Sequence, residues 1–488
     1  MAPLSLWMKV HRWLGLIAMV AVLCFGLSGL IHPIMSRTQP QPAERSAPIL
    51  PPAGALVPLK TALNRAGIDA FSSARLFALV GQPVYRVGLA GEPARYFAAS
   101  DASPLADGER VHAEALARHY TGDTASAVAA LTRITAFDAD YPAVNRLLPV
   151  WRVQLARADG LTAYVDTEGN RLATLNDDRK RALQSVFRAL HTFNLFDGVP
   201  ALRIALMLLL LGATFSTAVA GTVMYLRLKR ADVRLKHQTA RRWHRRLALA
   251  VVLTTFTFSL SGTWHLLQGE RTLPPPTSIV PRFLTSELGE YAPTTGFSLL
   301  NAGERACYRL PVVQTTVVGS GQSGEHAHHH GAMPATAEPA PARCLDTGTG
   351  AELPDADRRA AEALARQFAG AAEGGVELSP VTRFGGEYGF INKRLPVWRA
   401  RFAGSDDAWY VESDSGALAL HTDTPARLEG LSFAYLHKWT FFGEDHKDLR
   451  DALLALFAFG NVVVAGLGTW VFFRRRRRPA LAASPEMA

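Results

Sequence analysis

The stretch LPVWR at residues 148–152 returns unchanged at residues 395–399, and this repetition decides how the rest of the chain is interpreted. Asn145 precedes the first copy and Asn392 the second, at the same distance. Other matches keep the same order along the chain: AEALAR at 113–118 and 361–366, LSG at 27–29 and 260–262, and GT at 221–222 and 468–469. Because the order is kept throughout, the sequence predicts an internal duplication in which each half reads span, external domain and span.

Four apolar stretches are long enough to cross a bilayer, which takes roughly 20 residues. The fold class predicted is an α-helical membrane bundle of four spans plus two periplasmic α+β regions. The segments expected are span 1 at 1–34, region 1 at 35–198, span 2 at 199–226, a basic loop at 227–246, span 3 at 247–267, region 2 at 268–448, span 4 at 449–473 and a tail at 474–488. A signal peptide is the alternative for span 1, but the segment is long and offers no good small-x-small cleavage site.

The positive charge of the chain lies mostly beside these spans. The 488 residues include 52 Lys and Arg against 42 Asp and Glu, a net charge of +10. Residues 1–12, 227–246 and 474–488 together carry +14, so the remaining segments carry −4. Positive residues flanking membrane spans stay in the cytoplasm. The basicity therefore predicts that both termini and the 227–246 loop are cytoplasmic, and it gives no reason to expect nucleic-acid binding.

Both external regions show strand and helix patterns. Residues 149–156 and 161–166 alternate in polarity around a turn, and residues 396–402 and 408–412 repeat this hairpin. Region 2 also contains a Gly-, Ser-, Ala- and Pro-rich insertion at 312–343, which we expect to be disordered. Four histidines in the insertion form a weak metal-binding signal, for which a solvated linker is the alternative: His326, His328, His329 and His330. Cys307 and Cys344 bracket it, either as a disulfide that closes the loop or as two free thiols.

Six of the 15 histidines form three matched pairs near the ends of the spans: His11 with His244, His32 with His265, and His191 with His437. His11 and His32 are about 31 Å apart along one helix, so they lie near opposite membrane faces. Histidine is costly in a membrane segment and suggests function by default, although an interfacial position is the plain alternative. The repetition of all three pairs favours a role as cofactor ligands over an interfacial position, because facing imidazoles in helical bundles hold b-type haem.

We therefore expect one to three haem b groups, bound by pairs of histidines. His11 and His244 meet on the cytoplasmic side among three arginines: Arg12, Arg245 and Arg246. These arginines either pair with haem propionates or serve only to orient the chain in the membrane. The other four histidines converge on the outer side and hold one haem or two. The sequence names no catalytic residue.

The chain resembles the PepSY-associated membrane proteins, a family often described as iron-regulated or iron-uptake membrane proteins. The resemblance rests on HRWLGL at 11–16, LSG at 27–29, LPVWR at 148–152, Leu-His at 190–191 and their second-half copies, and it covers nearly the whole chain. Residues 344–350 (CLDTGTG) also look like a PepSY strand with its terminal turn. One departure is RRLAL at 245–249, where the first half has RWLGL at 12–16; it leaves the histidines untouched.

Some members of this family are ferric-siderophore reductases with haem in the membrane and PepSY domains in the periplasm. The resemblance therefore implies that electrons cross the inner membrane to a ferric siderophore or another Fe(III) chelate. The cytoplasmic segments are too short for a flavin or nicotinamide domain, so quinol or a separate reductase would supply the electrons. Two alternatives remain. One is a peptide- or protease-binding PepSY module without redox activity, and the other is a component of a metal transporter.

Overall fold

The computed structural model describes residues 3–50, 54–228, 239–269, 278–303, 305–311, 342–370, 374–443 and 446–476. The chain divides into two compact units. We call the first the helical unit; it comprises Met1–Thr38, Arg179–Thr272 and Pro425–Ala488. The second, the strand-rich unit, comprises Gln39–Asp178 and Leu273–Thr424. Each unit therefore takes segments from both halves of the sequence.

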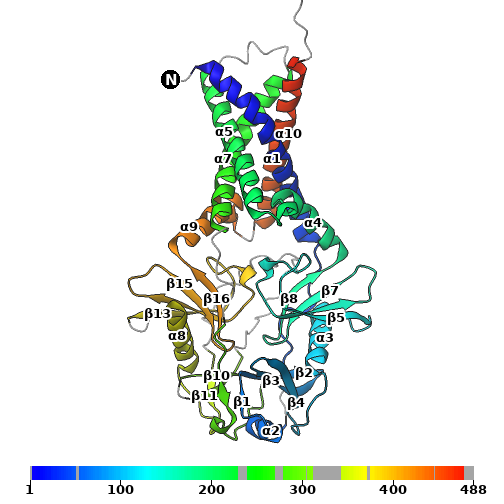
Figure 1. Ribbon diagram of the computed structural model, residues 1–488, viewed down its shortest axis with the longest axis vertical. Coiled ribbons are helices and arrows are strands. Elements are labelled where there is room, and N and C mark those ends of the chain that lie inside the picture. Colours follow the sequence, from blue (N-terminus) through cyan, green and yellow to red (C-terminus); the bar gives the residue numbers. More distant parts are fainter. Residues whose placement is uncertain are drawn as a thin grey trace, which may run out of the picture. The chain divides into compact units, whose positions relative to one another are not determined.

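Four long apolar helices form the core of the helical unit (Figure 1). They are α1 (Leu4–Thr38), α5 (Pro200–Arg227), α7 (Thr239–Gly269) and α10 (Lys447–Arg476). Each has the length and hydropathy of a membrane span. Helix α1 packs against α5 and α10, and α7 packs against the same two helices. Helix α1 contains Pro33 and ends at Thr38, four residues beyond the predicted end of span 1.

Small residues let these helices approach one another. Ala18, Ala21 and Ser28 are the buried positions of α1. A Cβ atom added at Gly26 would lie 2.6 Å from Val462 Cγ2 of α10, so a larger residue there would force Val462 to move. Close contacts between small residues are typical of helix packing in membranes, where apolar surface alone does not drive helices to associate.

Two short helical segments precede the second span of each half. In the first half, α4 (Asp178–His191) leads through a 3-10 turn, η2 (Asn194–Phe196), into α5. In the second half, α9 (Thr424–Ser432) continues as the π-helical η5 (Phe433–His437) and the turn η6 (Thr440–Phe442) before α10. Both His191 and His437 are the last residues of their segments.

The strand-rich unit contains two four-stranded antiparallel sheets with the same strand order. One has β5 (Val128–Ile134), β6 (Val150–Leu155), β7 (Thr162–Asp166) and β8 (Arg171–Asn176); the other has β13 (Val376–Val381), β14 (Val397–Phe402), β15 (Ala408–Glu412) and β16 (Ala417–Thr422). Their registers also agree, since Trp151 lies opposite Val165 and Trp398 opposite Val411. Helices α3 (Gly108–Thr121) and α8 (Ala356–Ala369) pack on these sheets. The hairpins predicted around LPVWR are therefore present in both halves.

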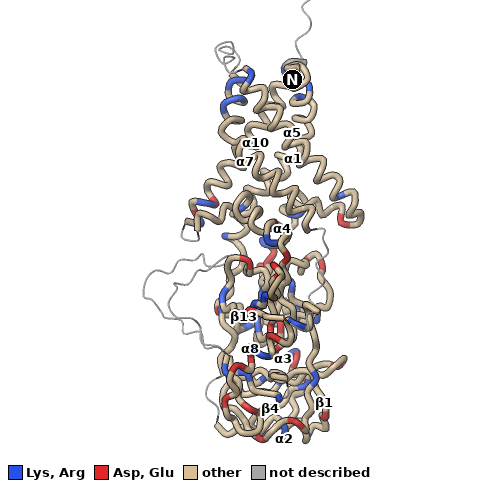
Figure 2. Tube along the Cα trace, turned by 90° about the vertical axis from the view of Figure 1, so that its left-hand side faces the viewer, with Lys and Arg blue, Asp and Glu red and all other residues tan. Residues whose placement is uncertain are grey.

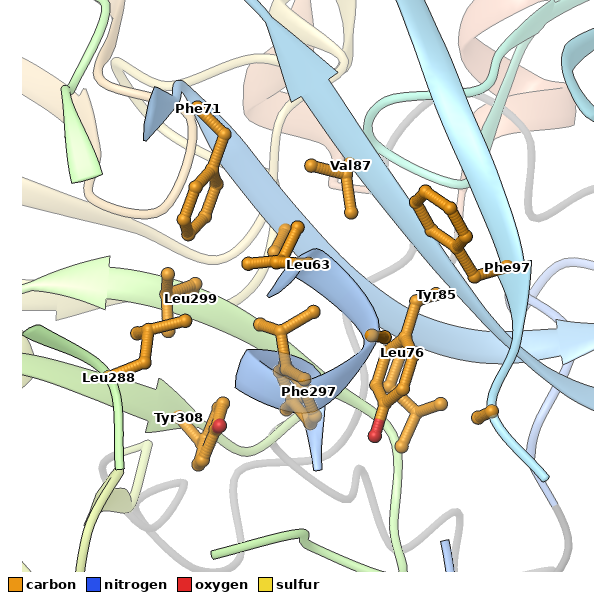
Figure 3. Close-up of a cluster of buried hydrophobic side chains, with 14 of the residues drawn as sticks. Leu63, Phe71, Leu76, Tyr85, Val87, Phe97, Leu288, Phe297, Leu299 and Tyr308 are labelled. Carbon is orange, nitrogen blue, oxygen red and sulfur yellow. The ribbon is translucent and has the colours of Figure 1, made fainter. Parts of the chain in front are cut away.

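A six-stranded sheet joins the two halves. Its order is β12 (Cys344–Asp346), β11 (Ala306–Arg309), β10 (Phe297–Asn301), β2 (Ser73–Leu79), β3 (Gln82–Leu89) and β4 (Glu92–Ala98). The joint is the antiparallel pair β2–β10, in which Leu76 lies opposite Phe297. Around it, a buried apolar cluster takes side chains from both halves (Figure 3). The sequence predicted separate external regions and did not indicate this shared sheet.

The remaining elements connect these sheets. They are α2 (Leu59–Arg65), the pair β1 (Ala70–Phe71) and β9 (Phe283–Leu284), and the 3-10 turns η1 (Ala143–Asn145), η3 (Thr285–Glu287) and η4 (Phe390–Asn392). Ion pairs also cross between the halves, for example from Arg171 to Glu412 at 2.8 Å. The sheet and these pairs make the unit one body rather than two domains in series.

Cys307 and Cys344 lie on neighbouring strands, β11 and β12, where both are buried free thiols. Their side chains are in hydrogen-bonding contact. A disulfide between them stays a prediction. The His-rich insertion between them, with its four histidines, lies outside the described residues, as do residues 229–238 of the basic loop. In the described part, Lys and Arg gather at the end of the helical unit that holds the N-terminus (Figure 2).

Candidate functional site

The helical unit brings His11 of α1 next to His244 of α7, with the rings in an edge-on arrangement. Their ring centres are 6.1 Å apart and the rings are inclined by 64°. Nδ1 of His11 lies 3.1 Å from the carbonyl oxygen of Thr217, and Nδ1 of His244 lies 3.0 Å from that of Val464. A carbonyl oxygen only accepts hydrogen bonds, so each Nδ1 carries the proton. Each Nε2 is then left with a free lone pair.

Two glycines make room for this pair. Gly221 of α5 and Gly468 of α10 lie beside the imidazoles, and a Cβ atom at either position would lie 3.2 Å from His11 Cε1 or 3.1 Å from His244 Cε1. These distances are shorter than an ordinary van der Waals contact. The glycine of each repeated Gly-Thr pair therefore lets the helix backbone approach the neighbouring imidazole ring.

A second pair forms between His191 and His437, at the ends of α4 and η5. Their ring centres are 6.4 Å apart, and the rings are inclined by 82°. Nδ1 of His191 lies 2.8 Å from Ser28 Oγ, and Nδ1 of His437 lies 3.1 Å from Ser261 Oγ.

The serine hydroxyls already use their protons. Ser28 Oγ donates to the Phe25 carbonyl at 2.9 Å, and Ser261 Oγ donates to the Thr257 carbonyl at 2.6 Å. Each serine oxygen therefore accepts from the imidazole, which again places the proton on Nδ1 and leaves Nε2 free. All four paired histidines have the same tautomer, although their acceptors are backbone carbonyls in one pair and serines in the other.

Phenylalanines fix the ring planes of the second pair. Phe187 stacks on His191 with centres 4.8 Å apart, and Phe433 stacks on His437 at 4.7 Å. Each phenylalanine is four residues before its histidine, so one helical turn brings the two rings together. Burial lowers the pKa of His191 to about 4 and that of His437 to about 3, which keeps both rings neutral at physiological pH.

His32 and His265 have other neighbours. The His32 ring lies 5.9 Å from Phe187, and His265 stacks on Phe433 at 4.3 Å. Nδ1 of His265 is also 2.6 Å from Glu429 Oε1. Of the six histidines predicted as ligands, the structure brings four into two facing pairs. Within the described residues, it shows no close ring contact between either of the other two and another imidazole.

The three arginines predicted as charge partners are close to the His11–His244 pair in sequence, and the structure gives contacts for two. The Arg12 guanidinium lies 5.5 Å from the Phe472 ring centre, and that of Arg245 lies 5.4 Å from Tyr225. Arg245 also donates to the Leu228 carbonyl at 3.2 Å. Arg246 follows Arg245 on α7. That these arginines pair with haem propionates stays a prediction.

Sequence reasoning missed Lys438, the residue after His437. Its Nζ lies 4.9 Å from the Phe433 ring centre, and burial lowers its pKa. The first half has Thr192 in the corresponding place, so the comparison of halves that revealed the histidines could not reveal this lysine. Phe187 and Phe433 were also missed, although their repetition four residues before the matched histidines was visible in the sequence.

The spacing of each pair fits the two axial ligands of a haem. Two imidazoles that bind one metal ion through Nε2, with bonds of about 2 Å, place their ring centres roughly 6 Å apart. The observed separations are 6.1 and 6.4 Å. Protonated Nδ1 atoms that donate to fixed acceptors are the usual outer partners of ligating histidines. Among the described residues, no group of three or more His, Cys, Asp or Glu could hold a bare metal ion.

A family model, the PepSY-associated TM region, matches residues 8–475. The chain belongs to this family. The resemblance drawn from the histidine and LPVWR motifs is thereby confirmed, and the four apolar helices are those of a multi-pass membrane protein with PepSY-like α+β regions. Among curated proteins, no sequence matches the chain.

Proposed function

We propose that the chain is a haem-b reductase of the bacterial inner membrane that passes electrons to a periplasmic ferric chelate. The observation that carries the proposal is the presence of two facing histidine pairs with free Nε2 atoms at two levels of one helical bundle. His11 and Ser28, which mark these levels on α1, are about 25 Å apart along the helix axis. The pairs therefore cover most of a hydrocarbon core of about 30 Å.

The His11–His244 pair and the His191–His437 pair would each hold one haem b, within the range of one to three that the sequence allowed. Bis-imidazole haem supplies one-electron exchange without a change of ligands. The chain's own groups hold the imidazoles in place. Donation from Nδ1 fixes the tautomer and makes Nε2 a stronger ligand, while the stacked Phe187 and Phe433 hold the ring planes of the second pair.

The direction of electron flow follows from orientation. The net +14 of the basic blocks argues that both termini and the 227–246 loop are cytoplasmic, so the His11–His244 pair receives electrons there. Quinol or a separate reductase is the proposed donor. At the other membrane face, one electron reduces Fe(III) to Fe(II), which oxygen donors hold more weakly, so the iron is released. The matching halves indicate that this layout arose by duplication.

An anaerobic mixing experiment tests the activity. Purified protein is reduced with dithionite, freed of excess reductant and mixed with a ferric hydroxamate chelate. We expect the reduced absorption bands to decay while a chromogenic Fe(II) chelator reports one Fe(II) for each electron lost. Reduced bands that persist in the presence of the chelate would contradict reductase activity. The same mixing with the Ga(III) chelate, which accepts no electron under these conditions, is the control.

A further inference from the structure

The turns η1 and η4, which precede the two LPVWR copies, bring a cation from each half of the chain together in the strand-rich unit. Arg146 follows η1 and Lys393 follows η4. The two turns pack against each other, and Nη1 of Arg146 donates a hydrogen bond to Oδ1 of Asn392, the residue before Lys393. The Arg146 guanidinium therefore lies against the turn that carries Lys393.

Both turns are built by the same bonds. Asn145 donates from Nδ2 to the carbonyl oxygen three residues earlier at 3.0 Å, and Asn392 does the same at 2.9 Å. The next residue is left-handed in each half, with φ of 59° at Arg146 and 63° at Lys393. Glycine adopts this conformation without a steric penalty, yet both halves have a long cationic side chain there.

Neither cation has an acidic partner among the described residues. The Arg146 side chain bonds to the neutral amide of Asn392, and Lys393 Nζ lies 4.1 Å from the Phe390 ring centre. Burial lowers the pKa of Lys393 to about 8 and also lowers the pKa of Arg146, and no carboxylate acts against this at either residue. The two charges are therefore partly dehydrated and not neutralised.

The next cation along the chain shows how the unit neutralises such charges elsewhere. Arg394 donates to Glu412, and Glu412 also pairs with Arg171 at 2.8 Å. A dehydrated cation without a counter-charge costs free energy, and a second cation close by adds repulsion. The η1–η4 junction thus keeps positive charge available for a ligand, whereas Arg394 and Arg171 do not.

We propose that the η1–η4 junction binds a small oxyanion with two negative charges, a dicarboxylate or a phosphate, through Arg146 and Lys393. Most N–H groups of the guanidinium stay available, and the ammonium group supplies further donors. Val144 and Ile391, on the two turns, are 60% and 45% exposed, so a ligand can reach the junction from solvent. The site belongs to neither histidine pair, so it is independent of the proposed electron transfer.

Isothermal titration calorimetry on the full-length protein, in an uncharged detergent at constant ionic strength, tests this proposal. The matched probes are succinate, succinamate and succinamide, which carry two, one and no negative charges. We expect succinate to bind and each lost charge to weaken binding about 10-fold, the value of one charge-assisted hydrogen bond. Inorganic phosphate is the second anion, and whichever of the two binds more tightly identifies the oxyanion. If neither binds more tightly than succinamide, the proposal is overturned.

Substitutions assign the binding to the two cations. Arg146→Gln and Lys393→Gln should each weaken the tighter anion about 10-fold, and Lys393→Arg should retain binding. Arg358→Gln, at an exposed cation of α8, is the matched control and should bind as the natural protein does. Because Lys393→Gln removes a cation without a counter-charge, its melting temperature without anion should not fall, which separates lost binding from unfolding. Unchanged affinity in both glutamine variants would refute the assignment.

Discussion

The two histidine pairs resemble each other in spacing and differ in what holds them. Backbone carbonyls of α5 and α10 accept from His11 and His244, whereas the side chains of Ser28 and Ser261 accept from His191 and His437. A carbonyl cannot be removed by substitution, but a serine can. The first pair is therefore fixed by the helix packing itself, and the second can be tuned by single side chains.

A buried histidine outside the two pairs shows that this arrangement is not general. His112 of the strand-rich unit lies with Nδ1 3.0 Å from the Tyr96 hydroxyl and Nε2 2.9 Å from Asn170 Oδ1. Both of its nitrogens are used, so it has no lone pair to offer a metal. The four paired histidines each keep one nitrogen free, and that difference separates a ligand from a structural histidine.

Removal of one paired histidine should have the largest effect. We expect His244→Ala and His437→Ala each to lose one haem of two and to abolish electron transfer, because each pair would keep a single imidazole. The pyridine haemochrome count per chain measures this. His32→Ala and His265→Ala are the controls and should retain both haems. If those variants lost haem while His437→Ala did not, the assignment of the second pair would be wrong.

Substitution of Gly221 should damage the His11–His244 pair alone. The side chain of Gly221→Val would press on His11 Cε1 and turn the ring away, so we expect loss of most of the haem at that pair. Gly212→Val is the matched control on the same helix, since a Cβ atom there meets no other atom within 4 Å. Absorption spectra of the two variants, with haem counts, compare them. Equal haem loss in both would show a general defect of α5.

Loss of a serine acceptor should have a smaller effect, confined to the second pair. Ser261→Ala removes the partner of His437 Nδ1, and such outer partners are worth about 10-fold or more in metal affinity. We expect about 10-fold faster haem transfer to apomyoglobin from that site. Ser259→Ala, which removes a hydroxyl bonded only within α7, is the control. Equal rates in the two variants would mean that Ser261 does not orient the ligand.

The structural histidine should produce the smallest effect. Burial lowers the pKa of His112 to about 4, below the usual 6.5, so the unfolded chain binds more protons between these values and stability falls as the pH falls. From pH 7 to 5.5 the loss is about 1 kcal/mol. The second half has Ala360 in the place of His112, so His112→Ala is a natural substitution there. We expect the melting temperature of this variant to depend less on pH than that of the natural protein. Parallel pH profiles would contradict this.

Repeated motifs allowed much of the fold to be predicted. The LPVWR copies and their alternating flanks predicted the hairpins β6–β7 and β14–β15, and the apolar runs predicted α1, α5, α7 and α10. The shared six-stranded sheet was not predictable, because the β2–β10 pairing joins residues more than 200 positions apart and depends on how the halves meet. Local sequence patterns do not contain such long-range pairings.

The candidate site was predicted as six histidines, and the meeting of His11 with His244 was predicted with them. Which of the four outer histidines meet was left open, because it depends on where α4 and η5 end after the chain turns back toward the bundle. Ser28 and Ser261 were visible only as part of the repeated LSG motif. Their use as hydrogen-bond acceptors follows from their carbonyl bonds to Phe25 and Thr257, which only coordinates reveal.

The haem content of the purified full-length protein tests the central claim most directly. Protein from haem-replete cells should be red, with a low-spin bis-histidine spectrum and two haem b per chain by the pyridine haemochrome method. In the double variant His244→Ala/His437→Ala, the count should fall to zero while the protein stays folded and membrane-bound. A colourless, folded natural protein, or a double variant that keeps its haem, would contradict the account.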